Sequence, residues 1–189
     1  FAFQKAESLY RSLGNAEGIA EVNYQRGVLL SNLGNAREAR PILDQALQFA
    51  QTASSDQQQI AILLQLSAVM QRLEGPEKAR DYATTAIDLA RAKGLEPLAA
   101  RGLIDLGNSY FLAGDPIRAK DYYTQALEAA RRNRSRRTEA RALLSLGSLG
   151  IQQGNYVDGV KQVDSALGFY REGGYRKVHG RLRRRAEGI

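Results

Sequence analysis

The residues that could do chemistry are few, and their spacing assembles neither a catalytic site nor a metal site. His179 is the only histidine, and it lies among Arg and Lys with no second ligand at helical spacing. The chain has no cysteine, no Ser/His/Asp grouping, no Gly-rich phosphate loop and no His-Glu-x-x-His motif. Asp105, Asp115 and Asp121 are interpreted as helix caps or surface residues. The sequence therefore predicts a protein that is not an enzyme and holds no cofactor or metal.

The basic residues gather in two segments of a chain whose formal net charge is +7. Residues 131–141 hold six arginines and one glutamate, and residues 171–189 hold seven basic and two acidic residues. Arg134, Arg137 and Arg141 follow one another at intervals of three and four, which predicts a basic stripe on one helical face. Because no aromatic residue is interleaved to stack on bases, the pattern favours a solvated face or an acidic protein partner over specific nucleic-acid binding.

Residues 99–130 contain the element that is repeated along the chain, a pair of helices joined by a tight turn. Leu103, Leu106 and Tyr110 lie at spacings of three and four and therefore share one face of the first helix. Gly114 suits the left-handed conformation that ends a helix, and the Asp-Pro pair after it is typical of a helix start. Small alanines alternate with Tyr and Leu on the second helix, a pattern that favours close helix crossing.

This helical pair recurs at a constant interval along the chain, without insertion. The first copy departs from the pattern at Asn23 and Arg26, where leucine is expected. Four copies predict a stack of helical hairpins in which each unit buries its apolar face against its neighbours. The equivalent positions include Ala46, Ala86, Ala126 and Ala166, and the close-approach position holds Gly27, Ser67, Gly107 and Gly147.

The spacing of the third copy resembles the tetratricopeptide repeat pattern W-x2-L-G-x2-Y followed by A-x3-F. Here the pattern reads Leu103-x2-Leu106-Gly107-x2-Tyr110 and then Ala119-x3-Tyr123, with Leu and Tyr in place of the Trp and Phe. The resemblance implies an all-α fold, a right-handed solenoid of about ten antiparallel helices. The period of about 40 residues, longer than the usual tetratricopeptide unit, also resembles the repeats of large bacterial regulatory multidomain proteins.

The repeat predicts a single solenoid over residues 1–189, which we expect to be cut from a longer protein. Because half repeats at both ends lack a partner, we expect the chain to self-associate end to end. No apolar run is long enough to span a membrane and no signal peptide is present, so the prediction is a cytoplasmic protein without membrane contact. The predicted units are a half repeat at 1–13, repeats at 14–54, 55–94, 95–133 and 134–173, and a basic half repeat at 174–189.

In the tetratricopeptide family the first helices of the repeats line a concave surface on which extended peptides lie. The resemblance therefore implies a groove on the helix face opposite Leu103, Leu106 and Tyr110. An alternative interpretation is that these positions pack against adjacent first helices or a missing domain. A carboxylate clamp is disfavoured, because apolar residues stand where its lysines are required. The predicted groove residues are Tyr24, Val28, Leu64, Arg101, Ile104, Asn108, Phe111, Arg141, Leu144 and Ile151.

The function that this pattern favours is a protein–protein interaction scaffold with a concave, partly apolar peptide-binding groove. The partner is expected to be a protein or a peptide, and the scaffold to be the non-catalytic module of a larger regulatory protein. Two alternatives stay open. One is a nucleic-acid-binding solenoid that uses the basic cluster at 131–141, and the other is a structural spacer between catalytic domains.

Overall fold

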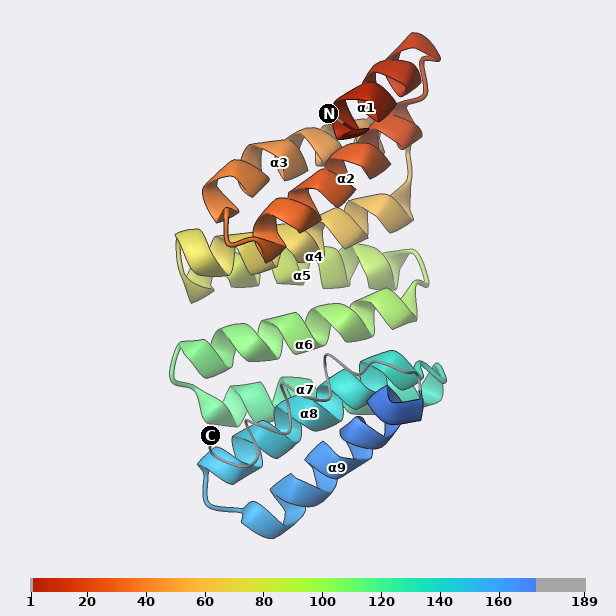
Figure 1. The fold of residues 1–189 in the computed structure, drawn as a ribbon. Helices are drawn as coiled ribbons and strands as arrows, with labels where there is room; N and C mark the ends of the chain where they lie inside the picture. Colours follow the sequence, from red (N-terminus) through yellow and green to blue (C-terminus); the bar gives the residue numbers. More distant parts are fainter. Residues whose placement is uncertain (1, 173–189) are drawn as a thin grey trace.

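A computed structural model describes residues 2–172, and within this range the chain forms nine α-helices and no strand. The helices stack in chain order from one end of the molecule to the other (Figure 1). The predicted all-α solenoid is confirmed, whereas the predicted half repeat at 174–189, including His179, lies outside the described residues. The helices are α1 (Ala2–Ser12), α2 (Ala16–Asn32), α3 (Ala36–Thr52), α4 (Asp56–Leu73), α5 (Pro76–Ala92), α6 (Glu96–Leu112), α7 (Pro116–Arg132), α8 (Arg136–Gln152) and α9 (Tyr156–Glu172).

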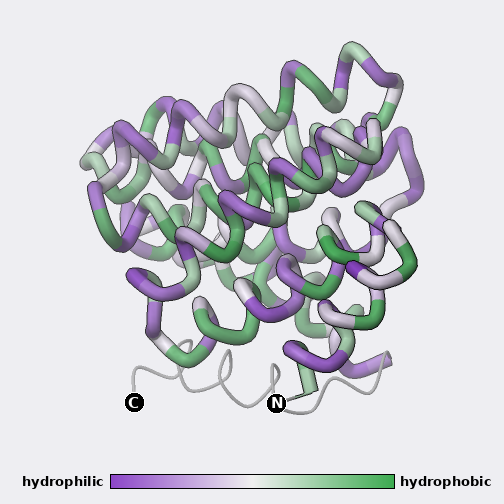
Figure 2. The backbone as a smooth tube through the Cα atoms, turned by 90° about the horizontal axis from the view of Figure 1, so that it is seen from above, coloured by the Kyte–Doolittle hydropathy of each residue, from purple (hydrophilic) through white to green (hydrophobic). Residues whose placement is uncertain are grey.

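The helices form two layers that are packed to different degrees. Every helix contacts its neighbours along the chain, and α2, α4, α6 and α8 also contact one another in succession. Among the described helices, α3, α5, α7 and α9 make no such contacts with each other. The stack therefore curves toward the layer of α2, α4, α6 and α8, which we call the inner helices. The faces of these helices that point away from α3, α5, α7 and α9 form the concave surface. Seen down the stack, hydrophobic and hydrophilic residues alternate along the helices, as is typical of amphipathic helices (Figure 2).

The hairpin turns place one residue in the left-handed region at nearly regular intervals along the chain. Gly114 has a φ of 80°, and the turn closes with a bond from the Asp115 amide to the Tyr110 carbonyl oxygen at 2.9 Å. The Asp115 carboxylate then accepts a hydrogen bond from the Arg118 amide at 3.0 Å, which confirms its predicted role as a cap. Ser54 and Arg134 adopt the same backbone conformation without being glycine.

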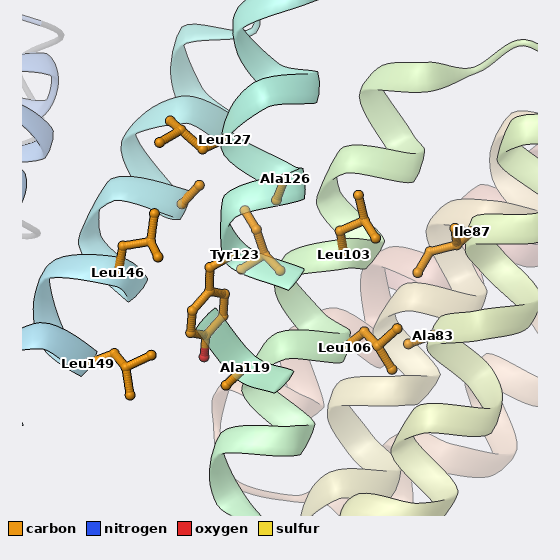
Figure 3. Packing of buried hydrophobic residues seen from close by; sticks show 12 residues of the cluster. Ala83, Ile87, Leu103, Leu106, Ala119, Tyr123, Ala126, Leu127, Leu146 and Leu149 are labelled. Carbon is orange, nitrogen blue, oxygen red and sulfur yellow. The ribbon is translucent and has the colours of Figure 1, made fainter. Parts of the chain in front are cut away.

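The core between α6 and α7 depends on small residues that allow the two backbones to approach. Ala119 and Ala126 are fully buried, as the alternation of small and large side chains predicts. The ring of Tyr123 lies against Gly107, where a Cβ atom would stand 2.5 Å from Cε1 of the ring. Leu146 and Leu149 of α8 close the same cluster from the next unit (Figure 3).

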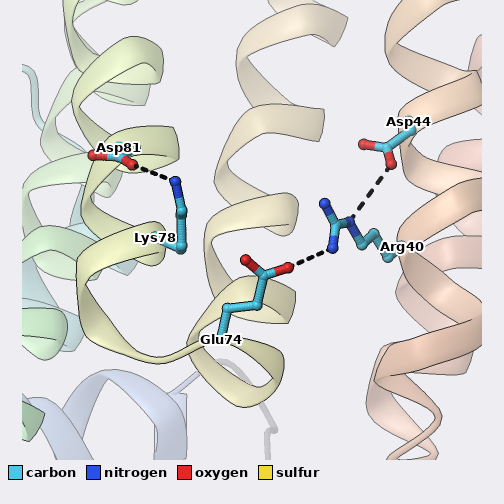
Figure 4. A network of polar contacts seen from close by, with 5 residues as sticks. All are labelled: Arg40, Asp44, Glu74, Lys78 and Asp81. Carbon is cyan, nitrogen blue, oxygen red and sulfur yellow. Dashed lines mark hydrogen bonds and ion pairs between the residues drawn. The ribbon is translucent and has the colours of Figure 1, made fainter.

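Ion pairs on the outside of the stack are accessible to solvent and add little to this packing. Arg40 of α3 pairs with Asp44 one helical turn later and with Glu74 at the end of α4 (Figure 4). Lys78 and Asp81 of α5 form a second exposed pair at 3.7 Å. Pairs of this exposure contribute between zero and about 1 kcal/mol each. Apolar contact between the helices is therefore the main source of stability.

We expect Gly107→Ala to lower the free energy of unfolding by about 1–3 kcal/mol, because the added methyl group meets the buried ring of Tyr123. The matched control is Gly168→Ala in α9, where nothing lies within 4 Å of the new methyl group. The control substitution improves helix propensity and is expected to raise stability by up to about 1 kcal/mol. Urea unfolding followed by circular dichroism measures both effects, and equal stability of the two variants would contradict this account of the packing.

Candidate functional site

The concave surface contains a hollow of about 600 Å³. Most of its lining comes from the inner helices α4, α6 and α8, and α7 and α9 contribute one residue each. The hollow therefore spans three successive repeats. Its lining residues are Ser67, Ala68, Gln71, Arg72, Asp105, Asn108, Phe111, Leu112, Tyr123, Leu144, Ser145, Ser148, Leu149, Ile151, Gln152 and Val163.

The hollow combines apolar side chains with a small number of polar groups. Leu112 is 61% exposed, and packing within the chain does not explain a large hydrophobic residue of this exposure. The Tyr123 hydroxyl donates a hydrogen bond to Oδ1 of Asn108 at 2.8 Å. Burial raises the pKa of Tyr123, and the nearby Asp105 carboxylate adds to this effect. Because the phenol stays protonated, it holds the Asn108 carbonyl oxygen and orients the amide nitrogen for donation to a ligand.

A carboxylate lies in the wall of the hollow between two arginines. Oδ1 of Asp105 is 3.2 Å from Nη2 of Arg141, and the two side chains are 18% and 34% exposed. Burial raises the pKa of Asp105, while the positive charges of Arg141 and then Arg101 oppose the rise. The interpretation of Asp105 as a cap or surface residue is therefore wrong. Its spacing of four from Arg101 is the signal that places the two residues on one helical face.

A second hollow, of about 260 Å³, lies between α2 and α4 and has an acidic lining. Nε2 of Gln58 is 3.2 Å from the Glu17 carbonyl oxygen and 3.4 Å from Oε2 of Glu21. Oε1 of Gln58 is buried and has no hydrogen-bond partner. The residues that line this hollow are Glu17, Glu21, Tyr24, Ser55, Gln57, Gln58 and Ala61.

The structure distributes the ten predicted groove residues over several environments. Leu64 and Ile104 are 2% and 1% exposed, because the inner helices contact each other and bury these positions between them. We therefore exclude both residues from the proposed binding surface. The other eight are partly accessible: Asn108, Phe111, Leu144 and Ile151 line the large hollow, Tyr24 lines the small one, and Val28, Arg101 and Arg141 line neither.

The sequence pattern misses several residues of the large hollow. Arg72 and Leu112 line the hollow and are equivalent residues of successive repeats. Leu112 directly follows Phe111, which is one of the predicted groove residues. Arg72 also donates from Nη1 to the Ser31 carbonyl oxygen and so joins α4 to α2. The sequence shows that Arg72 and Leu112 are equivalent in the repeat. It does not show that they face the concave surface, because this depends on the curvature of the stack.

The basic cluster at 131–141 is partly neutralised by carboxylates. Arg131 pairs with Glu139 at 2.9 Å, Arg136 with Glu172 at 2.7 Å, and Arg141 with Asp105. The predicted stripe of Arg134, Arg137 and Arg141 on one helical face is wrong. Arg134 lies in the turn before α8 with a φ of 52°, so only the other two share that face.

Other kinds of site find little support in the part of the chain that the structure describes. Residues 2–172 contain no group of three or more His, Cys, Asp or Glu residues placed to hold a metal ion. Within the same range, no helix combines the length and the hydrophobicity needed to cross a membrane.

Comparison with protein-family models identifies the repeats. Two models that describe the tetratricopeptide repeat match residues 18–92 and residues 100–133. The chain therefore belongs to the tetratricopeptide repeat family, as its spacing predicts, and its fold is that of a protein–protein interaction module. A comparison with curated proteins finds no match.

Solved structures share the fold at low sequence identity. Aspartyl phosphate phosphatase F from Bacillus subtilis has a TM-score of 0.80 and 14% identity over 96% of this chain and 49% of its own. A Rap protein complexed with Competence and Sporulation Factor has a TM-score of 0.68 and 18% identity over 91% of this chain and 44% of its own. A STAND protein with a tetratricopeptide repeat sensor, from Pyrococcus horikoshii, has a TM-score of 0.72 and 15% identity. That match covers 95% of this chain and 28% of the STAND protein, so this chain spans less than half of each of the three proteins.

We expect Arg141→Gln to lower the free energy of unfolding by about 1 kcal/mol at neutral pH, because it leaves the Asp105 carboxylate in the wall of the hollow without its nearest counter-charge. An aspartate whose folded-state pKa is raised destabilises the fold as pH rises through that pKa. The loss should therefore be smaller at acidic pH, because the raised pKa of Asp105 favours uptake of a proton there.

The matched control is Arg136→Gln, whose pair with Glu172 is 69% and 66% exposed. This variant should stay within about 0.5 kcal/mol of the parent at either pH. Urea unfolding at the two pH values measures both variants. If the loss of stability in Arg141→Gln does not change with pH, the ion pair with Asp105 does not account for that loss.

Proposed function

We propose that this chain binds an extended segment of a partner protein in the hollow formed by α4, α6 and α8. The chemistry of the hollow is the observation that carries the proposal: apolar side chains of Phe111, Leu112, Leu144 and Ile151 surround polar groups such as Asn108. A volume of about 600 Å³ lies within the range of binding sites in proteins. The hollow can therefore take apolar side chains of the segment, and burial of apolar surface is the dominant favourable term in most protein–protein association.

The repetition of the hollow along the stack favours an extended chain over a compact ligand. Ala68, Asn108 and Ser148 occupy equivalent positions on α4, α6 and α8, so each of these three helices presents a small or polar residue at the same level. Such residues leave room for a peptide backbone and, at Asn108 and Ser148, offer it hydrogen bonds. The Rap protein complexed with Competence and Sporulation Factor has the same fold, which supports binding of a separate partner.

We also propose that the chain is the non-catalytic module of a larger regulatory protein. The support is the STAND protein, in which a tetratricopeptide repeat sensor accompanies other domains. A cytoplasmic location remains a prediction. End-to-end self-association also stays a prediction, and α1 supports it: none of its described residues is buried, and Leu9 is 59% exposed.

Nucleic-acid binding through the cluster at 131–141 is the weaker alternative. Three of its six arginines are engaged with carboxylates, and Arg136 also lies over the ring of Phe169 at 5.8 Å. Phosphate contacts would make the affinity fall steeply with salt, whereas binding in an apolar hollow should change little. Fluorescence anisotropy with random RNA and duplex DNA at two salt concentrations separates these cases. The structural-spacer alternative predicts that no ligand binds the hollow.

We expect a random peptide display library to enrich binders to the parent chain, and the double substitution Leu112→Gln with Leu144→Gln to weaken them at least tenfold. The substitutions place amides where apolar side chains of the peptide are buried. The control is Ile117→Gln with Val157→Gln, because these residues are 81% and 69% exposed and lie outside the hollow. Equal loss in both double variants, with circular dichroism unchanged, would place the binding surface elsewhere.

A further inference from the structure

The charge on the concave surface changes sign along the stack. One row of equivalent positions on the inner helices α2, α4, α6 and α8 holds Glu21, Ala61, Arg101 and Arg141. The row is acidic on α2 and basic on α6 and α8. Because the inner helices contact their successors, these side chains lie along one continuous surface.

At the α2 end, the smaller hollow is lined by two carboxylate residues and by no basic residue. Glu21 accepts hydrogen bonds from Gln25 at 2.7 Å and from Gln58 at 3.4 Å, but both donors are neutral amides. Glu17 lies one helical turn earlier on the same face, and the ring of Tyr24 forms part of the wall. Two carboxylates beside an aromatic ring suit a lysine or arginine side chain.

At the α6–α8 end, two guanidinium groups share one carboxylate. Arg141 contacts Asp105 through a single nitrogen, and Nε of Arg101 is buried without a hydrogen-bond partner. Arg137 lies one helical turn before Arg141 and is exposed. This end therefore keeps a net positive charge and suits an aspartate or glutamate side chain.

The distance between the two ends matches a short extended peptide. Packed helices lie about 8–10 Å apart, so the two steps from the α2–α4 pair to the α6–α8 pair cover roughly 16–20 Å. An extended chain advances about 3.3 Å per residue and crosses this distance in about five or six residues. The larger hollow, with its apolar side chains, lies on α4, α6 and α8 beside this path.

We propose that the bound segment is a short extended peptide with opposite charges at its two ends. A lysine or arginine lies over α2 and α4, apolar side chains enter the larger hollow, and an aspartate or glutamate lies over α6 and α8. This inference rests on the proposed function, and it adds the charge pattern of the partner. Charge complementarity of this kind fixes the register of a ligand more than it raises the affinity.

The test is selection from a random dodecapeptide library against the parent chain and against Glu17→Gln with Glu21→Gln. We expect the parent to enrich apolar peptides that carry a basic and an acidic residue about five or six positions apart. The glutamine variant should keep the apolar and acidic preferences and lose the basic one. The control is Glu38→Gln with Glu128→Gln, which makes the same change of charge at exposed positions on the outer helices α3 and α7 and should select like the parent.

Affinity measurements on the enriched peptide make the test quantitative. Replacing its basic residue by methionine should weaken binding to the parent about fivefold at low salt and leave binding to the Glu17→Gln/Glu21→Gln variant unchanged. Apolar peptides enriched without a charge preference would overturn this inference and leave the proposed function standing. A library from which nothing is enriched would overturn the proposed function as well.

Discussion

Close approach of the helices within each hairpin is the constraint on which the rest of the structure depends. At Gly107, Ala119 and Ala126 the side chains are small enough for two backbones to meet, and the Tyr123 ring fills the remaining space. Because equivalent positions recur once in every repeat, every hairpin has nearly the same geometry, and the stack grows as a regular superhelix. The exposed ion pairs at the periphery follow from this packing and do not determine it.

The surface proposed for binding is a consequence of the same geometry. The inner helices contact one another and the outer helices do not, so the stack curves and opens a hollow on its inner side. Tight contact between inner helices buries Leu64 and Ile104 and leaves the residues one turn further along accessible. Each repeat thus contributes one inner helix to a common surface, and differences between repeats give that surface its apolar region and its two charged ends.

Much of the fold could be predicted from the sequence, because the helical period, the turn glycines and the Asp115 cap are local signals that do not depend on distant residues. The candidate site could be predicted only in part. The curvature of the stack decides that Leu64 is core and Leu112 accessible, and the pairing of Asp105 with Arg141 joins different repeats. Asn23 stands where leucine is expected and is fully buried, with both polar atoms of its amide unpaired. The repeat pattern shows that Asn23 departs from the expected leucine, but it does not predict that the amide is buried without hydrogen-bond partners.

The central claim is that the inner face of the helical stack binds an extended segment while the outer layer serves as support. Hydrogen–deuterium exchange, measured by mass spectrometry with and without a selected peptide at saturation, tests this claim most directly. Exchange is expected to slow in the inner helices α4, α6 and α8, because ordering the hollow suppresses their local opening. The outer helices α5 and α7 should change little. Protection confined to α5, α7 or the turn at 133–135 would contradict the claim and place the interaction on the outer surface.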